Sequence, residues 1–121
     1  AEALSLAAVS DQRFVGHVLF TVFSGSGADE GRAGALLGPL AVLPDNQKQE
    51  IGSALVRAGI EHLRKLGIRQ IFVLGDPNYY GRFGFQQERL LMPPYALPER
   101  WSAAWQSLTI ADAKPLERFR F

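Results

Sequence analysis

The chain has 121 residues and a mass of 13.3 kDa, a length that suits one folded domain spanning residues 1–121. Hydrophobic residues make up 47% and charged residues 21%, which excludes a largely disordered chain, and a net charge of +1 gives no support to a nucleic-acid partner. Because the sequence has no Cys and two separated His, it excludes disulfides and thiolate sites and predicts that no metal is bound.

The longest apolar stretch, residues 35–44, is about half as long as a helix that crosses a bilayer. The first residues also lack the basic start of a secretory signal. We therefore expect a soluble, cytoplasmic protein with no membrane partner.

The first part of the chain predicts an antiparallel front. Ala3–Val9 and Phe14–Val22 are rich in apolar, β-branched and aromatic residues and flank a polar turn, as in a hairpin. A Gly-rich loop, Ser24–Gly34, leads to a central strand over Leu36–Leu43. Since Pro39 has no backbone N–H, we expect this strand to be irregular there, with a bulge or a splayed edge.

A strand–helix–strand unit follows. From Ile51 the apolar positions have helical spacing, with one face formed by residues 51, 54, 55, 58, 62, 63 and 66. The helix is followed by a strand over Ile68–Leu74, and such units pair their strands in parallel. The fold class is therefore α/β (α+β), a mixed sheet with an antiparallel front and a parallel centre.

The rest of the chain predicts shorter elements. In order they are a helical turn (Asn78–Phe83), a strand (Phe85–Leu91), a helix (Pro98–Gln106) and a strand-like end (Ser107–Ala111). Trp101 and Trp105 are four residues apart, and we expect them to dock the tail helix onto the sheet.

The start of the long helix predicts an anion site. A tight polar turn joins the strand end at Pro44 to Ile51, and the first turn of a helix has unpaired N–H groups and a positive dipole end. A phosphate can bind there without a cationic side chain. Gly52 and Ser53 are small enough to let a ligand approach the backbone.

Two sequence blocks carry a resemblance to a known family. Gln47-Lys48-Gln49-Glu50-Ile51-Gly52 follows a Leu-Ala-Val-Leu-Pro run, and Gly75–Phe85 contains Tyr80-Gly81-Arg82-Phe83-Gly84-Phe85. In this order and spacing the chain resembles the GNAT superfamily of acyl-CoA-dependent N-acetyltransferases. Its pyrophosphate loop reads Gln/Arg-x-x-Gly-x-Gly/Ala, and a Tyr-x-x-Phe/Leu-Gly-Phe segment follows the next strand.

The resemblance implies a GNAT-like sheet in which two parallel strands part, and acetyl-CoA lies in the cleft between them. The cofactor-binding residues it implies are Leu40, Ala41, Val42, Gln47, Lys48, Gln49, Glu50, Ile51, Gly52, Ser53 and Asn78. Tyr80 is implied as the acid that protonates the leaving thiolate, although a packing role for its ring fits equally well. For Tyr79 we prefer packing in the core.

The implied function is transfer of an acetyl group from acetyl-CoA to an amine of a small molecule or peptide by direct attack. An alternative is a GNAT-fold module that no longer binds the cofactor and acts as an interaction domain. The sequence assigns no general base and no acceptor.

The chain departs from the family pattern in two places. Glu50 stands where the pattern has Gly, and many relatives also have Gly at the position of Lys48. A carboxylate facing inward at Glu50 would repel a diphosphate, and Lys48 could offset part of that repulsion.

The strand and two helices that open full-length relatives have no counterpart before Ala3. The chain is then a fragment, or a complementing chain supplies these elements, or the bare sheet edge at Ala3–Val9 pairs with a second copy in a homodimer.

Overall fold

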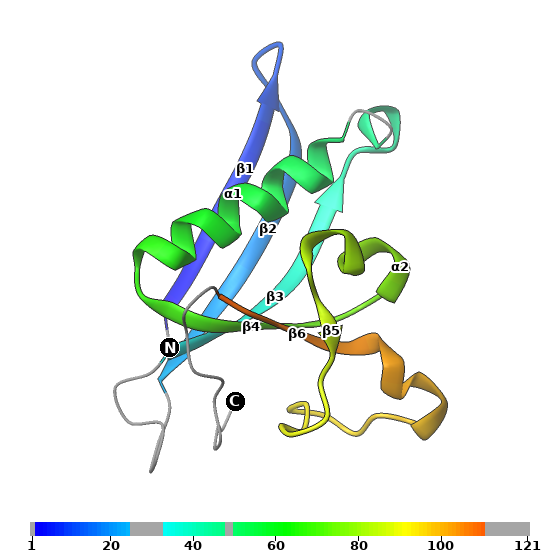
Figure 1. Ribbon diagram of the computed structural model, residues 1–121. Helices are drawn as coiled ribbons and strands as arrows, with labels where there is room; N and C mark the ends of the chain where they lie inside the picture. The colour runs from blue at the N-terminus through cyan, green and yellow to red at the C-terminus, as the bar shows by residue number, and fades with distance from the viewer. Residues whose placement is uncertain (1, 25–32, 48–49, 111–121) are drawn as a thin grey trace.

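A six-stranded mixed sheet forms the centre of the molecule, with strand order β1-β2-β3-β4-β6-β5 (Figure 1). The structure is a computed structural model that describes residues 2–24, 33–47 and 50–110. Its elements are β1 (Glu2–Ser10), β2 (Arg13–Ser24), β3 (Ala33–Val42), the 3-10 turn η2 (Pro44–Asn46), α1 (Ile51–Lys65), β4 (Ile68–Leu74), α2 (Pro77–Tyr80), η3 (Gly81–Phe83), β5 (Gln86–Gln87), η4 (Glu99–Ala104) and β6 (Trp105–Thr109).

The predicted front hairpin and the predicted parallel strand–helix–strand unit are confirmed. β1 and β2 form the antiparallel hairpin, and β2 also pairs antiparallel with β3. β3 pairs parallel with β4, and α1 is the crossover helix that connects these two strands. The central strand begins earlier than predicted, at Ala33 instead of Leu36. β1 is the outermost strand on its side of the sheet, so its free edge stays a predicted surface for a second copy.

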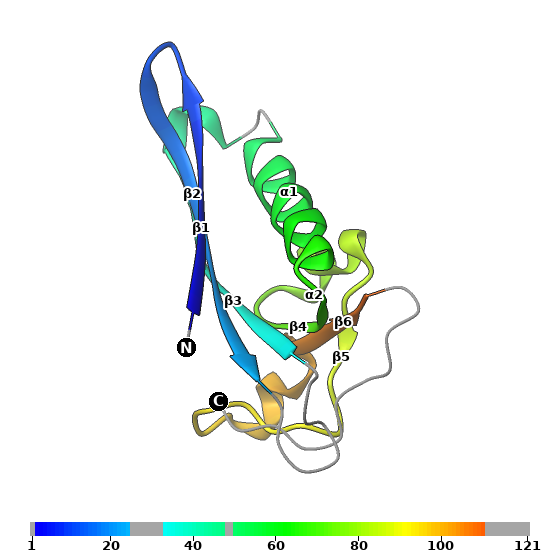
Figure 2. The ribbon, with the colours of Figure 1, turned by 90° about the vertical axis from the view of Figure 1, so that its left-hand side faces the viewer.

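Helix α1 lies on one face of the sheet and contacts β1, β2, β3 and β4 (Figure 2). Its side chains meet the fully buried Val18 and Phe20 of β2 in the main hydrophobic core. Other core members from β3 and β4 include Ala35, Leu37, Ile71 and Val73. Burial of this much apolar surface fixes the helix against the sheet and thereby fixes where its first turn lies.

The predicted apolar face of α1 is partly wrong. The buried helix residues are Ser53, Leu55, Val56, Gly59 and Leu63, whereas Ala54, Ala58, His62 and Leu66 are exposed. The true stripe is rotated toward Val56 and Gly59, because the helix packs so close to β2 that Phe20 leaves no room for a Cβ atom at residue 59. Ala54 and Ala58 belong to the predicted face because Ala is apolar, but Ala is a strong helix former and also occupies exposed helix positions.

A second, smaller core covers the opposite face of the sheet. Phe72 of β4 stacks on Trp105 of β6 with ring centroids 5.7 Å apart, and Leu91 packs against both. The Trp105 indole N–H donates to the Leu91 carbonyl at 2.8 Å. The long segment between β5 and β6 is therefore held on this face of the sheet.

The tail differs from the prediction because Trp105 belongs to this second core and pairs with β4. Residues 99–104 form a 3-10 helix, and Trp105, expected in a helix, opens strand β6. Trp105 is 2% exposed and Trp101 is 52% exposed, so the two rings do not dock one helix together. The predicted strand over Phe85–Leu91 is reduced to Gln86–Gln87.

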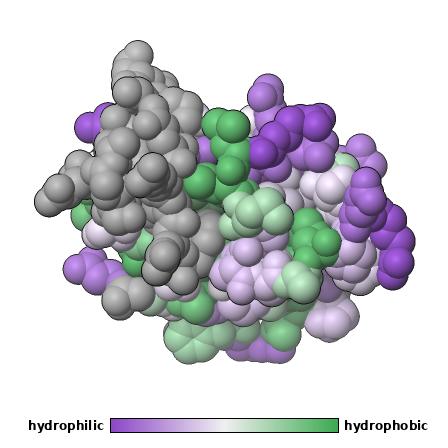
Figure 3. Space-filling view, turned by 90° about the horizontal axis from the view of Figure 1, so that it is seen from below, coloured by the Kyte–Doolittle hydropathy of each residue, from purple (hydrophilic) through white to green (hydrophobic). Residues whose placement is uncertain are grey.

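The lower end of the molecule carries several apolar side chains at the surface. Leu90, Met92 and Tyr95 are each more than two fifths exposed. Seen from below, hydrophobic residues lie among paler ones in the middle of the view, and strongly hydrophilic residues lie toward the upper and right-hand rim (Figure 3). Among the described residues, no helix has both the length and the apolar character needed to cross a bilayer.

Candidate functional site

The parallel strands β3 and β4 part halfway along β3. Their register ends at Leu37↔Val73, while β3 continues to pair with β2 as far as Gly16↔Val42. At the point of parting, β3 has two residues, Gly38 and Pro39, where β2 has Leu19 alone. The predicted irregularity at Pro39 is thus confirmed, and its cause is a ring that leaves no N–H for a ladder hydrogen bond.

The first turn of α1 faces the space where the strands part. Figure 1 shows the end of β3, the start of α1 and α2 on the same side of the molecule. The first hydrogen bond of the helix is donated by the Ala54 N–H to the Glu50 carbonyl at 3.0 Å. The N–H groups of Ile51, Gly52 and Ser53 precede it, so they have no acceptor within the helix. The aligned peptides of a 15-residue helix add a partial positive charge at this end.

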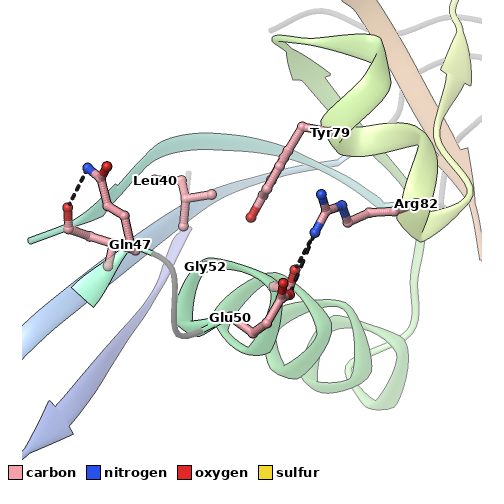
Figure 4. A pocket seen from close by; sticks show the side chains of 8 residues that line it. Leu40, Gln47, Glu50, Gly52, Tyr79 and Arg82 are labelled. Atoms are coloured by element: carbon pink, nitrogen blue, oxygen red, sulfur yellow. Dashed lines mark hydrogen bonds and ion pairs between the residues drawn. The ribbon is translucent and has the colours of Figure 1, made fainter. Parts of the chain in front are cut away.

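A pocket of about 320 Å³ lies over this first turn. It is lined by Leu40, Val42, Gln47, Glu50, Gly52, Ser53, Tyr79 and Arg82, and Figure 4 shows these side chains around a shared space. Gln47 fixes one wall, because its side-chain amide donates to the Val42 carbonyl at 3.2 Å. The floor is the backbone at Gly52, where a Cβ atom would lie 2.7 Å from the Tyr79 hydroxyl oxygen.

Glu50 caps α1 in a backbone conformation that few side chains adopt. Its φ is +58° and its ψ is +21°, in the left-handed region that favours glycine. The Glu50 side chain is 76% exposed and points toward Arg82 (Figure 4). The backbone thus gives a physical reason for Gly at this position in the family pattern.

Arg82 has three contacts at the mouth of the pocket. Its Nη1 donates to the Ser53 hydroxyl at 3.2 Å and lies 3.6 Å from Oε2 of Glu50. Its guanidinium carbon lies 4.6 Å above the centre of the Tyr79 ring. Arg82 therefore links η3, the cap of α1 and the aromatic wall of the pocket.

The two neighbouring tyrosines of α2 have different surroundings. Tyr79 lines the pocket, whereas the half-buried ring of Tyr80 packs edge-on against Tyr79 and Phe85, with centroid distances of 5.0 and 5.8 Å, and rests on Gly75. Burial, and to a lesser degree the neighbouring Tyr79, raises the pKa of the Tyr80 hydroxyl above its ordinary value of 10.0. Tyr80 therefore stays neutral at physiological pH.

Helix α2 itself is positioned by a cap. The Asp76 carboxylate accepts from the Asn78 N–H at 2.9 Å, and Pro77 occupies the first helical position. These local interactions turn the chain sharply after β4 and bring Tyr79 and Arg82 back over α1.

The structure brings most of the predicted site residues together. Leu40, Val42, Gln47, Glu50, Gly52 and Ser53 line one pocket. Ala41 faces the other side of β3, opposite His17, and Ile51 packs against the main core. Asn78 and Tyr80 stand beside the pocket and are not among its lining residues. Lys48 and Gln49 lie outside the described residues.

Sequence reasoning missed Arg82 and the pocket position of Tyr79. Arg82 is 29 residues from Ser53 in the chain, and nothing in the local pattern joins them. A signal in the sequence is the acidic Glu50 at the tight turn before α1, since a phosphate bound there would need a cation to offset it, and Arg82 lies inside the second of the two sequence blocks. Among the described residues, no group of three or more His, Asp and Glu side chains could hold a metal ion.

Comparisons with known proteins agree with this geometry. The family model described as "Acetyltransferase (GNAT) domain" matches residues 2–87. The uncharacterized N-acetyltransferase YjhQ of Escherichia coli is 43% identical over 112 residues, which cover 88% of this chain and 62% of YjhQ.

Two similar crystal structures contain a nucleotide cofactor. A GNAT family acetyltransferase from Brucella melitensis in complex with acetyl-CoA is 36% identical, with a TM-score of 0.66, covering 93% of this chain and 61% of its own. The GNAT family protein YhbS from Escherichia coli in complex with CoA is 29% identical, with a TM-score of 0.70, covering 89% of this chain and 59% of its own. This chain thus spans about three fifths of the length of these relatives. With its mixed sheet, parted strands and first-turn pocket, the chain belongs to the GNAT acetyltransferase family.

Proposed function

We propose that this domain takes part in transferring an acetyl group from acetyl-CoA to an amine of a small molecule or peptide. The observation that carries the proposal is the pocket over the first turn of α1, at the place where β3 and β4 part. It offers backbone donors for a diphosphate and an unpaired strand edge for the thioester arm. The two similar structures with CoA or acetyl-CoA bound support the choice of donor.

The N–H groups of Ile51, Gly52 and Ser53 would hold the diphosphate, because they point out of the helix end and need an acceptor. Leu40 and Val42 would contact the thioester arm along the parted half of β3. Absence of a side chain at Gly52 lets a phosphate approach the backbone, since the space above it is limited by the Tyr79 hydroxyl.

Transfer would proceed by direct attack of the amine nitrogen on the thioester carbonyl carbon. A carbon–nitrogen bond forms, the carbon–sulfur bond breaks, the amine proton passes to solvent or to a base, and the thiolate takes up a proton. Tyr80 is our proposed donor of that proton, since its raised pKa keeps it neutral. Holding amine and thioester side by side supplies much of the acceleration.

Two measurements test the proposal. Isothermal calorimetry should show saturable binding of acetyl-CoA to the wild-type protein, and a screen of amines should then identify acceptors by the release of free CoA thiol. Absence of acetyl-CoA binding would instead favour the non-catalytic interaction module, for which Glu50 in place of Gly is the specific observation.

Cytoplasmic location and homodimer formation stay predictions. Sedimentation analysis tests whether the protein forms a homodimer.

A further inference from the structure

We propose that Arg82 binds the diphosphate of the acyl donor and that Glu50 occupies Arg82 when the donor is absent. Donor affinity is then set by an exchange, in which the phosphates replace the Glu50 carboxylate at the guanidinium. This inference rests on the proposed function and adds a specificity-determining pair to it.

The position of Arg82 carries the first step. Its side chain is held over the start of α1 by a hydrogen bond to Ser53, which is 8% exposed, and by the Tyr79 ring beneath the guanidinium. The positive end of the helix dipole and a guanidinium thus face the same 320 Å³ pocket. Two positive groups at one surface favour an anion between them, and Arg binds phosphate through several donors at once.

The state of Glu50 carries the second step. Its carboxylate is 3.6 Å from Arg82, at ion-pair but not close hydrogen-bond distance, and both side chains reach solvent, with 76% and 42% exposed. Solvent-exposed ion pairs of this kind are weak. A diphosphate has a charge on each phosphate and can also accept from the backbone N–H groups of α1, so it displaces Glu50.

The charge inventory of the pocket supports the pairing. Among the described lining residues, Arg82 is the cationic side chain and Glu50 is the anionic one. The acidic residue that departs from the family pattern therefore faces a cation brought from the second sequence block. In the free protein the Glu50 carboxylate offsets the charge of Arg82, and in the complex the negatively charged phosphates take over that role.

The test is a double-mutant cycle read by calorimetry. CoA dissociation constants are measured for the wild type, Arg82→Gln, Glu50→Gln and the double variant. We expect Arg82→Gln to weaken CoA binding about tenfold, the size of one charged hydrogen bond, and Glu50→Gln to tighten it about threefold. In the Glu50→Gln background no carboxylate competes for Arg82. Adding Arg82→Gln to that variant should therefore raise the CoA dissociation constant at least tenfold.

Pantetheine, which has the thiol arm without the diphosphate, and dephospho-CoA, which lacks only the 3′-phosphate, identify the group that Arg82 contacts. Pantetheine affinity should be the same in all four proteins. The loss caused by Arg82→Gln should be equal for CoA and dephospho-CoA, and a loss confined to CoA would overturn the assignment to the diphosphate.

Arg57→Gln is the matched control. Arg57 is also an exposed arginine over an aromatic ring, 5.0 Å from the centre of Phe83, but it does not line the pocket. Its removal should change the CoA dissociation constant less than twofold, and a loss as large as that of Arg82→Gln would attribute the effect to net charge and overturn the inference. Thermal melting checks that each variant is folded, and Arg82→Lys should recover at least threefold of the lost affinity.

The outcomes separate the two proposals. If the wild type binds CoA but Arg82→Gln has no effect in the Glu50→Gln background, Arg82 merely neutralises Glu50, so the inference fails while the proposed function stands. If none of the four proteins binds CoA, the proposed function fails and this inference falls with it.

Discussion

The two halves of β3 differ in what surrounds them. The first half, Ala33–Leu37, lies between β2 and β4, and its inward side chains at Ala35 and Leu37 are 0% and 4% exposed. The second half, Gly38–Val42, is paired with β2 alone, and each of its residues is half-buried or exposed.

The difference separates stability from binding within one strand. Where both neighbours pair with β3, its side chains contribute apolar burial to the core. Where β4 turns away, backbone groups and the side chains of Leu40 and Val42 become available to a ligand. A single strand thereby carries part of the core and part of the pocket, and substitutions in the two halves should have different consequences.

The largest contrast is expected between Leu37→Ala and Leu40→Ala. Leu37→Ala removes a core side chain and should lower the free energy of unfolding by about 2–5 kcal/mol, measured by urea denaturation. Leu40→Ala should cost about 1 kcal/mol of stability but weaken CoA binding about fivefold, because Leu40 lines the pocket. Equal losses of stability, with no change in CoA affinity for either variant, would contradict the division of β3.

The next effect concerns Tyr80, which follows the end of β4 at the parted side. Tyr80→Phe keeps the packed ring and removes the proposed acid, so kcat should fall about a hundredfold while the CoA dissociation constant changes little. Tyr79→Phe is the control from the adjacent position, and it should spare kcat.

The pH profile tests the same residue independently. An acid must be protonated to act, and burial raises the pKa of Tyr80 above 10.0, so its ionisation should not reduce kcat below pH 10.

A kcat for Tyr80→Phe equal to that of the wild type would remove Tyr80 from the mechanism and leave its ring a packing role.

A smaller effect is expected at the floor of the pocket. In Gly52→Ala the new Cβ atom would lie 2.7 Å from the Tyr79 hydroxyl and would stand over the first turn of α1. CoA binding should weaken about tenfold, or 1.4 kcal/mol. Removing the hydroxyl in Gly52→Ala/Tyr79→Phe should recover part of that loss, and calorimetry of the three variants would show whether the clash is the cause.

The smallest effect concerns the cap of α1. Glu50→Gly relieves a left-handed residue and should stabilise the protein by about 1 kcal/mol, whereas Glu50→Gln keeps the strain and should leave stability nearly unchanged. Both variants should tighten acetyl-CoA binding a few-fold, since both remove a negative charge beside the phosphates. Weaker binding by Glu50→Gly than by the wild type would contradict a repulsive role for this carboxylate.

Much of the fold could be predicted because its signals are local. Runs of apolar, β-branched and aromatic residues around a polar turn mark the hairpin, helical spacing marks α1, and Pro39 marks the place where pairing fails. The face of α1 was predicted less well, because burial of Val56 and Gly59 depends on how close the helix comes to Phe20. Trp105 became a strand residue because β4 offers it a partner edge at Leu74, which outweighs the helical spacing of the two tryptophans.

The sequence by itself determined the front hairpin, the parallel strand–helix–strand centre, the tight turn before Ile51 and the resemblance to the family, since each depends on residues close together in the chain. Tertiary structure decided which side chains meet over that turn. Contact between Arg82 and Ser53 requires β4 to run beside β3 and the Asp76 cap to turn α2 back over α1, so it depends on packing between distant segments. The same packing places Tyr79 in the pocket and the Tyr80 ring against Phe85, a distinction that two adjacent identical residues cannot show in sequence.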